Sequence, residues 1–319
     1  MHRVLVTGAN GFIGGALCKR VHVEGWYVRG TIRSLKYLDE MPEGIDIVET
    51  DSIDAHTNWE KALEDIDTVV HLASKGHIVK DATADSLSAF RRINVTGTEH
   101  LARLAALKGI KRFIYLSSVK VNGEGKPISY TEKDTPAPSD PYSISKYEAE
   151  QVLQQIAGDT DLEIVVLRPP LVYGPGVKAN FLTLLRIVND GYWLPLASVK
   201  NRRSLIFLDN MIEAILAGIC HPDAAGKTYL VSDGDDVSTP ELIRRIAKAM
   251  EKSTKLLPFP PVLLRHASRL AGKSSVAHRL LNSLYVDISK IQTELDWSPR
   301  FSMKVGLSKT TKWFLKEFQ

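Results

Sequence analysis

A glycine-rich turn that follows the first apolar segment constrains the fold of this chain more than any other feature. Residues 4–14 read VLVTGANGFIG, a short apolar strand that runs through three spaced glycines into a helix. Such a turn exposes bare backbone N–H groups at the positive N-terminal end of a helix, where they bind a pyrophosphate. With the turn so early, we expect no secretory signal or membrane span ahead of it. The residues expected to hold a dinucleotide cofactor are Gly8, Asn10, Gly11, Phe12, Ile13 and Gly14.

Apolar segments alternate with helix-forming segments over the first 170 residues. The expected strands are Arg3–Thr7, Trp26–Thr31, Ile45–Thr50, Thr68–Leu72, Arg112–Ser117 and Glu163–Arg168. The expected helices are Gly14–Glu24, Asn58–Leu63, Ser86–Lys108 and Ser143–Ile156. Dense apolar strands are typical of a parallel sheet covered on both faces.

The alternation predicts an α/β fold with a Rossmann-type doubly wound parallel sheet. Residues 1–170 should form this domain and carry both the cofactor and the catalytic residues. Residues 171–319 show a looser pattern. We expect them to form mainly a smaller C-terminal α/β substrate lobe, with some of the chain returning to the first domain.

Composition and charge exclude several classes of protein. The net charge of +4 is small for a chain of 319 residues, so it implies no nucleic-acid partner. The apolar runs are too short for membrane insertion. The only two cysteines, Cys18 and Cys220, are expected to be buried. Without a disulfide framework or zinc spacing, we expect a cytoplasmic protein and no metal site. Residues 241–280 hold nine Lys and Arg against two Asp and Glu, which favours a solvated face, with weak contact to an anionic membrane as the alternative.

The end of the second strand indicates which dinucleotide is bound. An acidic residue about 20 positions beyond the glycines binds the ribose of NAD, whereas an arginine accommodates the 2′-phosphate of NADP. Here Arg33 and Ser34 follow the strand, and no acid occurs before Asp39. The pair favours NADP(H), while NAD(H) stays possible if Arg33 is only a solvated surface residue. Asp51 and Ser52, after the third strand, are candidates for contact with adenine.

A tyrosine and a lysine four residues apart form a candidate proton-transfer pair. Tyr142 and Lys146 fall on one face of a helix. The ordinary pKa of a tyrosine is about 10, and a nearby ammonium group lowers it by favouring the phenolate. Ser118 ends a strand at the carboxyl edge of the sheet, where α/β proteins bind ligands. We expect Ser118, Tyr142 and Lys146 to form the catalytic site, with Lys146 also binding the nicotinamide ribose.

Together these motifs resemble the extended short-chain dehydrogenase/reductase family, in particular its UDP-glucose 4-epimerase-like branch. The likeness continues at HLAS (71–74), NVTGT (94–98), LRP (167–169), YGPG (173–176), DISK (287–290) and LDWSP (295–299). The resemblance implies that Tyr142 is the general acid/base, that Lys146 modulates it and that Ser118 positions the proton. The further cofactor contacts that it implies are Leu72, Ala73, Ser74 and Pro169.

The same resemblance implies a UDP-sugar substrate. In the family an Asn at the start of a helix and an Arg on a later strand grip the diphosphate. These places match Asn180, next to Phe181, and Arg202, with Arg203 in its stead if the register differs by one. Arginine suits a diphosphate because it makes bidentate, charge-assisted hydrogen bonds.

Further substrate contacts are implied on both sides of the site. Arg279 resembles the arginine of a later R-x-x-D element, although Asn282 stands where the family has the acid. Lys120 and Asn122, which follow Ser118, are expected to face the sugar ring. Family members often pair through a four-helix bundle, which implies a homodimer through Ser86–Lys108 and Ser143–Ile156.

Two reactions are compatible with such a site. An epimerase oxidises C4, lets the keto sugar rotate and reduces its other face while NAD stays bound. A 4-ketoreductase uses fresh NADPH in each turnover, and Arg33 favours it. The closest resemblance is to reductases of UDP-4-keto-6-deoxy-N-acetylhexosamines, which serve O-antigen or capsule synthesis. We therefore expect this reduction, with a UDP-hexose or UDP-N-acetylhexosamine 4-epimerase that binds NAD tightly as the alternative.

Overall fold

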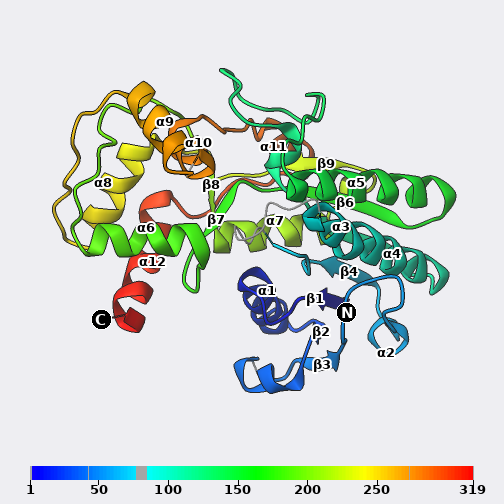
Figure 1. Ribbon diagram of the computed structural model, residues 1–319. Coiled ribbons are helices and arrows are strands. Elements are labelled where there is room, and N and C mark those ends of the chain that lie inside the picture. Colours follow the sequence, from blue (N-terminus) through cyan, green and yellow to red (C-terminus); the bar gives the residue numbers. More distant parts are fainter. Residues whose placement is uncertain (1, 42, 77–84, 273, 319) are drawn as a thin grey trace.

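A parallel sheet forms the centre of the molecule in the computed structural model (Figure 1). The structure describes residues 2–41, 43–76, 85–272 and 274–318. Within them the sheet has seven strands in the order β3-β2-β1-β4-β5-β6-β9. The strands are β1 (Arg3–Thr7), β2 (Tyr27–Ile32), β3 (Asp46–Glu49), β4 (Thr68–His71), β5 (Arg112–Leu116), β6 (Glu163–Arg168) and β9 (Thr228–Leu230). The predicted fold class and its six strands are confirmed, with boundary shifts of a residue. β9 comes from the second half of the chain and is an addition to that prediction.

Side chains that alternate along each strand build a core on both faces of the sheet. Val4 and Val6 pack with α1 (Phe12–Val23) and α7 (Leu208–Cys220). Leu5 points the other way and packs with α4 (Gly97–Leu107) and α5 (Pro141–Asp159). This two-sided burial explains why the strands read as continuous apolar runs. Cys18 is on the buried side of α1, as expected, but the burial predicted for Cys220 is wrong, because it is exposed at the end of α7.

The helix predicted at Ser86–Lys108 is divided into three segments. It comprises α3 (Asp85–Arg91), a π-helical turn η2 (Arg92–Thr96) and α4. Such turns are often found at functional sites. Here the turn contains Asn94, which is buried.

The helix that carries the candidate tyrosine begins two residues earlier than predicted. Asp140 caps α5 by accepting the Ser143 N–H at 2.8 Å, and the Ser143 hydroxyl accepts the Asp140 N–H at 3.1 Å. Pro141 suits the first helical position because it has no N–H to leave unpaired. Tyr142 is thereby fixed in the first turn, one turn before Lys146.

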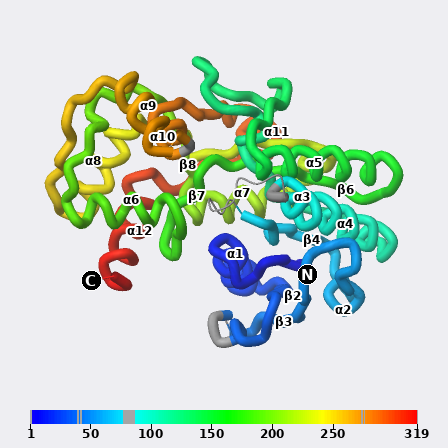
Figure 2. The backbone as a smooth tube through the Cα atoms, viewed as in Figure 1, coloured from blue at the N-terminus to red at the C-terminus, as the bar shows by residue number. Residues whose placement is uncertain are grey.

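A smaller lobe with its own apolar core gathers at one end of the molecule, on the left of Figure 1. The tube in Figure 2 follows the chain from the blue N-terminal strands to the red C-terminal helix of this lobe. Its main elements are β7 (Leu171–Tyr173), α6 (Ala179–Asn189), β8 (Leu205–Phe207), α8 (Thr239–Ala249), α9 (Pro261–Leu270), α10 (Ser274–Leu281) and α12 (Met303–Phe318). The shorter elements are η1 (Leu35–Glu40), α2 (Glu60–Leu63), η3 (Val119–Asn122), η4 (Pro222–Ala224) and α11 (Ser289–Leu295). Within the described parts of the chain, none of the helices combines the length and apolar character needed to cross a bilayer.

Candidate active site

The residues predicted to bind the cofactor lie at the carboxyl edge of the sheet. β1 and β4 are neighbours there although they are distant in sequence, and the strand order reverses between them. In open α/β sheets the crevice at such a reversal is where ligands bind. The glycine turn follows β1 and residues 72–74 follow β4, so the two segments lie on either side of this crevice.

The glycine turn is shaped for close approach of a ligand to the backbone. Gly8 has φ +69, and a Cβ there would lie 3.1 Å from the Ala73 Cα. A Cβ at Gly14 would overlap the Gly8 carbonyl oxygen. Helix α1 has no side-chain cap and no acidic residue in its first turn, so the N–H groups of that turn are available to an anion. These residues fit the pyrophosphate of a dinucleotide.

A buried hydrogen-bonded chain fixes the segment that follows β4. The Thr7 hydroxyl oxygen accepts the N–H groups of Leu72 and Ala73 at 3.2 and 3.1 Å. Its own proton therefore goes to Nδ1 of His71, 2.8 Å away, and Nε2–H of His71 donates to Thr98 at 3.0 Å. Burial, aided by the charge of Lys146, lowers the pKa of His71 to about 3, so the ring stays neutral. Sequence reasoning gave Thr7 and His71 no role of their own.

Asn94 connects the cofactor crevice to the catalytic helix. Its side-chain oxygen accepts the Lys75 N–H at 2.8 Å, and its amide group donates to the Ser145 hydroxyl at 3.0 Å. Ser145 lies between Tyr142 and Lys146 on α5. The asparagine thus ties the segment after β4 to the helix that carries Tyr142 and Lys146. The motif at residues 94–98 already contained this asparagine, without a role assigned to it.

The residues expected to select the dinucleotide lie at the ends of β2 and β3. Arg33 is exposed just beyond β2, and Ser34 is half-buried beside it. Asp51 and Ser52 are exposed beyond β3, where the Ser52 hydroxyl donates to Asp54 at 2.8 Å. Their positions are compatible with ribose and adenine contacts, which stay predictions.

The three proposed catalytic residues come from β5 and α5. Ser118 follows β5, and its side chain is hydrogen-bonded to Tyr142. Lys146 is buried, with Nζ donating to the Leu116 carbonyl at 2.9 Å and lying 4.6 Å from the centre of the Tyr115 ring. Serine, tyrosine and lysine are therefore gathered in one place, as the sequence predicted. Pro169 is buried nearby, and its carbonyl accepts the Val119 N–H at 3.0 Å.

The electrostatics of this group differ from the expectation. Burial and the negative charge of Asp140 raise the pKa of Tyr142 to about 12, against the opposing hydrogen bond from Ser118. Burial lowers the pKa of Lys146 to about 7, although the charge of Glu150 favours its protonated form. The net pKa of Tyr142 is therefore raised in the protein alone, and a lowering by Lys146 stays a prediction. A buried lysine near neutrality is a weak source of positive charge.

A buried ion pair lies directly behind Lys146. Glu150, one turn beyond Lys146, pairs with Arg168 at the end of β6, and both side chains are almost fully buried. The Ser117 hydroxyl donates to the same carboxylate. The Arg168 guanidinium also donates to the side-chain oxygen of Asn122 at 3.0 Å. The network joins the ends of β5 and β6 to α5, and sequence reasoning missed Glu150.

Asn122 requires a correction. It is only 2 % exposed, its oxygen is used by Arg168, and its amide group donates to the Thr131 carbonyl at 3.0 Å. Its side chain thus serves the protein interior and does not face a sugar. Lys120 Nζ contacts Asp140, the cap of α5, at 2.7 Å. It helps to hold that helix, and its contact with a sugar stays a prediction.

The two candidate arginines of the substrate lobe point in different directions. Arg202 has 60 % of its side chain exposed and pairs with Asp236 at 3.0 Å. Arg203 turns inward, where burial and the nearby charge of Arg279 lower its pKa while the charge of Glu124 opposes the shift. Two neighbouring cations in a partly buried setting favour an added anion. Of the two candidates, the structure therefore favours Arg203, together with Arg279, as the residue that binds an anion. This is the alternative that assumes a register shifted by one residue.

The two candidate substrate residues at the start of α6, Asn180 and Phe181, differ in exposure. Asn180 is exposed in the first turn, where it can reach a ligand. Phe181 is only 1 % exposed and stacks on Tyr173 with ring centres 5.4 Å apart. Its side chain therefore belongs to the core of the lobe, and only its backbone N–H is placed to bind an anion.

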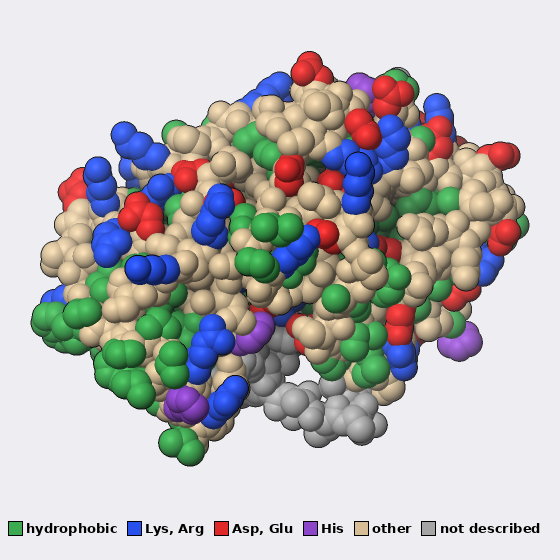
Figure 3. Space-filling view, turned by 90° about the horizontal axis from the view of Figure 1, so that it is seen from above, with side chains coloured by type: hydrophobic (Ala, Val, Ile, Leu, Met, Phe, Trp, Pro, Cys, Tyr) green, Lys and Arg blue, Asp and Glu red, His purple; other side chains and the backbone are tan. Residues whose placement is uncertain are grey.

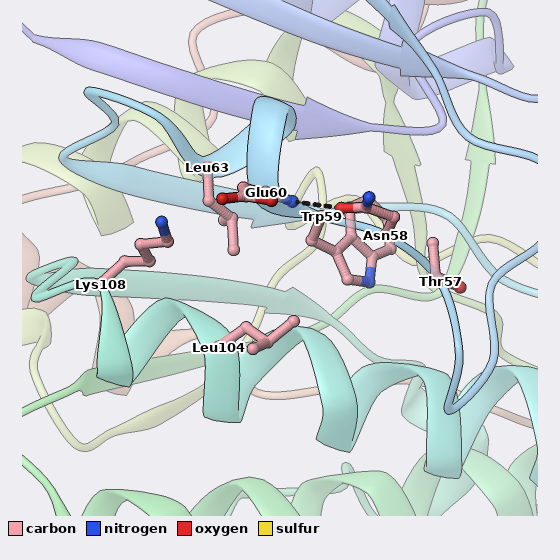
Figure 4. Close-up of a pocket in the computed structure, with 7 residues that line it drawn as sticks. All are labelled: Thr57, Asn58, Trp59, Glu60, Leu63, Leu104 and Lys108. Atoms are coloured by element: carbon pink, nitrogen blue, oxygen red, sulfur yellow. Dashed lines mark hydrogen bonds between the residues drawn. The ribbon is translucent and has the colours of Figure 1, made fainter.

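One surface cavity lies away from these residues. It has a volume of about 260 Å³ and is formed by α2, α4 and the loop before α2 (Figure 4). Its lining residues are Thr57, Asn58, Trp59, Glu60, Leu63, Leu104 and Lys108. None of the predicted site residues lines it, so we assign it no part in the chemistry.

Comparison with known proteins agrees with the geometry. The sequence pattern of the NAD dependent epimerase/dehydratase family matches residues 4–232. A UDP-glucose 4-epimerase of Vibrio cholerae is 40% identical over 317 residues, covering 98% of this chain and 95% of that protein. A dTDP-glucose 4,6-dehydratase of Haemophilus influenzae is 27% identical and covers 99% of this chain and 98% of its own length.

Solved structures share the fold. UDP-glucuronic acid 4-epimerase from Bacillus cereus in complex with NAD superposes with a TM-score of 0.80 at 23% identity, covering 99% of this chain and 100% of that one. A Thermotoga maritima UDP-glucose 4-epimerase with UDP-glucose also gives 0.80, at 21% identity and the same coverage. At such identities the likeness establishes the fold.

Proposed function

Because the chain belongs to the NAD-dependent epimerase/dehydratase family, we propose that it is a 4-epimerase of a UDP-hexose or UDP-N-acetylhexosamine. The observation that carries this choice is the 40% identity, over nearly the whole of both chains, to a UDP-glucose 4-epimerase. Serine, tyrosine and lysine placed together at the sheet edge support it. The 4-ketoreductase expected from the sequence becomes the second candidate.

Tyr142 carries the proton in the proposed reaction. In the first half its oxygen takes the proton of the sugar C4 hydroxyl while the C4 hydride leaves, which gives a 4-keto sugar. In the second half the hydride returns to the other face of C4 and Tyr142 gives the proton back. When bound, an oxidised nicotinamide supplies the hydride acceptor and a positive charge that favours the phenolate. Ser118 is placed to hold the C4 oxygen beside Tyr142.

The substrate lobe supplies the grip on the diphosphate. Arg203 and Arg279 repel one another in a partly buried setting, and a diphosphate between them would relieve that repulsion. The exposed first turn of α6, with Asn180, offers further donors to the same anion. Binding energy at the diphosphate can then hold the reacting sugar in place over the catalytic residues.

The second candidate is an NADPH-dependent reductase of a UDP-4-keto-6-deoxy-N-acetylhexosamine. Arg33 favours it, because an arginine at the end of β2 accommodates a 2′-phosphate. The solved relatives named above include one in complex with NAD. A preference for NADP(H) therefore rests on Arg33 and Ser34 alone.

The nucleotide that the purified protein carries should distinguish the candidates. We expect denaturation to release near-stoichiometric NAD, identified by chromatography, and the native protein to interconvert UDP-glucose with UDP-galactose or the N-acetyl pair. NAD stays bound because the closed redox cycle never requires its release. A protein that is empty or carries NADP, and that oxidises NADPH only with the 4-keto substrate, would instead establish the reductase.

Replacing Arg203 with alanine should raise KM for the UDP-sugar by about 10- to 100-fold, with a smaller change in kcat, since hydrogen bonds to charged groups contribute about 1.5–3 kcal/mol. Initial rates over a range of substrate concentrations measure both constants. Arg202→Ala is the matched control, and we expect it to leave KM within about twofold because Arg202 pairs with Asp236 at the surface. Equal effects of the two substitutions would contradict the assignment of Arg203.

Three further parts of the sequence interpretation stay proposals. They are the boundary of the domains near residue 170, the homodimer through the α3–α4 and α5 helices, and the cytoplasmic location. The pairing of Arg91 on α3 with Glu148 on α5, at 2.5 Å, shows that these two helices already pack together within one chain.

A further inference from the structure

Helix α9 exposes apolar side chains to an unusual degree. Of its ten residues, all of which the structure describes, none is buried. Val262, Leu263 and Leu270 are 61%, 52% and 92% exposed. Soluble proteins seldom expose a contiguous apolar patch without using it. An apolar cavity of about 360 Å³ lies between the inner side of the helix, residues 194–196 and α10.

Two exposed aromatic residues extend the apolar patch. Tyr192 and Trp193 are 62% and 63% exposed. Backbone hydrogen bonds of Leu194 with Lys255 and Leu257, each 2.8 Å long, hold this loop beside the segment that leads into α9. We call the combined region the α9 surface. Its apolar residues are Tyr192, Trp193, Phe259, Val262, Leu263 and Leu270.

Positive charge surrounds these apolar side chains. From Glu251 to Asp287 the sequence contains no other acidic residue but six Lys and Arg. Lys255 lies 5.8 Å from the centre of the Trp193 ring. Arg265 and Arg269 are exposed one turn apart on α9. Figure 3, which looks down on the side where α9 and α10 lie in Figure 1, shows hydrophobic side chains among Lys and Arg on the left part of this face.

The positions along α9 place the two kinds of side chain on adjacent flanks. Leu263 and Leu270 are seven residues apart and share one flank, whereas Arg265 and Arg269 share the other flank with Val262. A helix of this pattern lies in the plane of a membrane interface, with its leucines among the acyl chains and its arginines reaching up to the headgroups. Trp and Tyr prefer the same depth of a bilayer.

We propose that the α9 surface binds an anionic phospholipid bilayer, so that the protein is a peripheral membrane protein through its smaller lobe. The positive charge of the surface is complementary to an anionic bilayer. A second copy of the same surface would instead be repelled by the exposed cations. Nucleic-acid bases can stack on Trp193 and the arginines, but the exposed Val and Leu side chains of the same surface favour acyl chains. The contact is interfacial and separate from the proposed reaction.

Flotation of the full chain with vesicles tests the proposal. We expect binding to vesicles of phosphatidylcholine and phosphatidylglycerol mixed two to one, weak binding to pure phosphatidylcholine, and release at high salt. The double substitution Lys255→Glu/Arg269→Glu should weaken binding at least about tenfold, because each basic residue near an anionic surface strengthens it about fivefold. Leu263→Gln/Leu270→Gln should weaken it to a similar degree by removing the apolar contact.

A control variant with the same change in net charge, placed elsewhere on the protein, tests whether binding depends on the α9 surface. Lys312→Glu/Lys316→Glu reverses two exposed charges on α12, outside the α9 surface, and should bind vesicles nearly as the unaltered protein does. Retained cofactor binding would show that each variant is folded. The proposal is overturned if the unaltered protein does not float with anionic vesicles, or if the α9 and α12 variants lose binding equally. Preferential binding to a single-stranded oligonucleotide, or self-association that the α9 substitutions abolish, would also overturn it.

Discussion

Tyr142→Phe should lower the turnover of the UDP-sugar by about 10²- to 10⁴-fold, because the variant lacks the hydroxyl group that exchanges a proton with the C4 oxygen in the proposed reaction. The fold should be unchanged, since phenylalanine keeps the ring and its contact with Phe90, whose centre is 6.2 Å away. Steady-state rates with the UDP-sugar that the unaltered protein interconverts measure the loss of activity. A circular dichroism spectrum and a thermal unfolding curve verify the fold.

Tyr147→Phe provides the matched control for this experiment. Tyr147 lies on the same helix but is no part of the proposed site, so its loss should change the rate by less than about threefold. Turnover by Tyr142→Phe at the rate of the unaltered protein would refute the role of Tyr142 in either candidate reaction. A loss of both rate and stability would instead indicate that the hydroxyl supports the structure.

Glu150→Ala should lower the free energy of unfolding by about 3–5 kcal/mol, because it leaves the guanidinium of Arg168 buried without its partner. The substitution also removes the acceptor of the Ser117 hydroxyl and the negative charge that favours protonation of Lys146. The destabilisation therefore comes from the interior of the site and not from its surface. Denaturant unfolding followed by fluorescence measures the change.

Glu148→Ala is the control on the same helix. Glu148 also pairs with an arginine, Arg91, but both side chains are partly exposed, and such pairs contribute about 0–1 kcal/mol. We expect Glu150→Ala to lower the free energy of unfolding several-fold more than Glu148→Ala does. If the two substitutions cost the same, the buried pair does not hold β5, β6 and α5 together as proposed.

The main features of the site could be read from sequence because they are local. The glycine turn is a run of consecutive residues, and Tyr142 and Lys146 are one helical turn apart, so a short segment defines each. The sheet was equally accessible, because strands buried on both faces leave dense apolar runs. The sequence alone also determined that Ser118 would stand at the carboxyl edge of that sheet.

Contacts between distant segments were decided by the tertiary structure. Sequence could not show that Asn122 would accept a hydrogen bond from Arg168, or that Asn94, in a π-helical turn, would donate one to Ser145. Both depend on residues more than 40 positions away in the chain. The return of β9 to the sheet is of the same kind, since a three-residue strand has too little pattern of its own.

The choice between Arg202 and Arg203 shows most clearly which features the sequence determines and which depend on the folded chain. The sequence determined that a pair of arginines would lie near the substrate lobe, because they occur next to one another in a matching motif. Neighbouring residues of an extended segment point to opposite sides, so a shift of one position exchanges the inward and outward side chains. Pairing of Arg203 with Val237 and Leu284 sets that register. Only the folded lobe could therefore turn Arg203 inward and leave Arg202 at the surface.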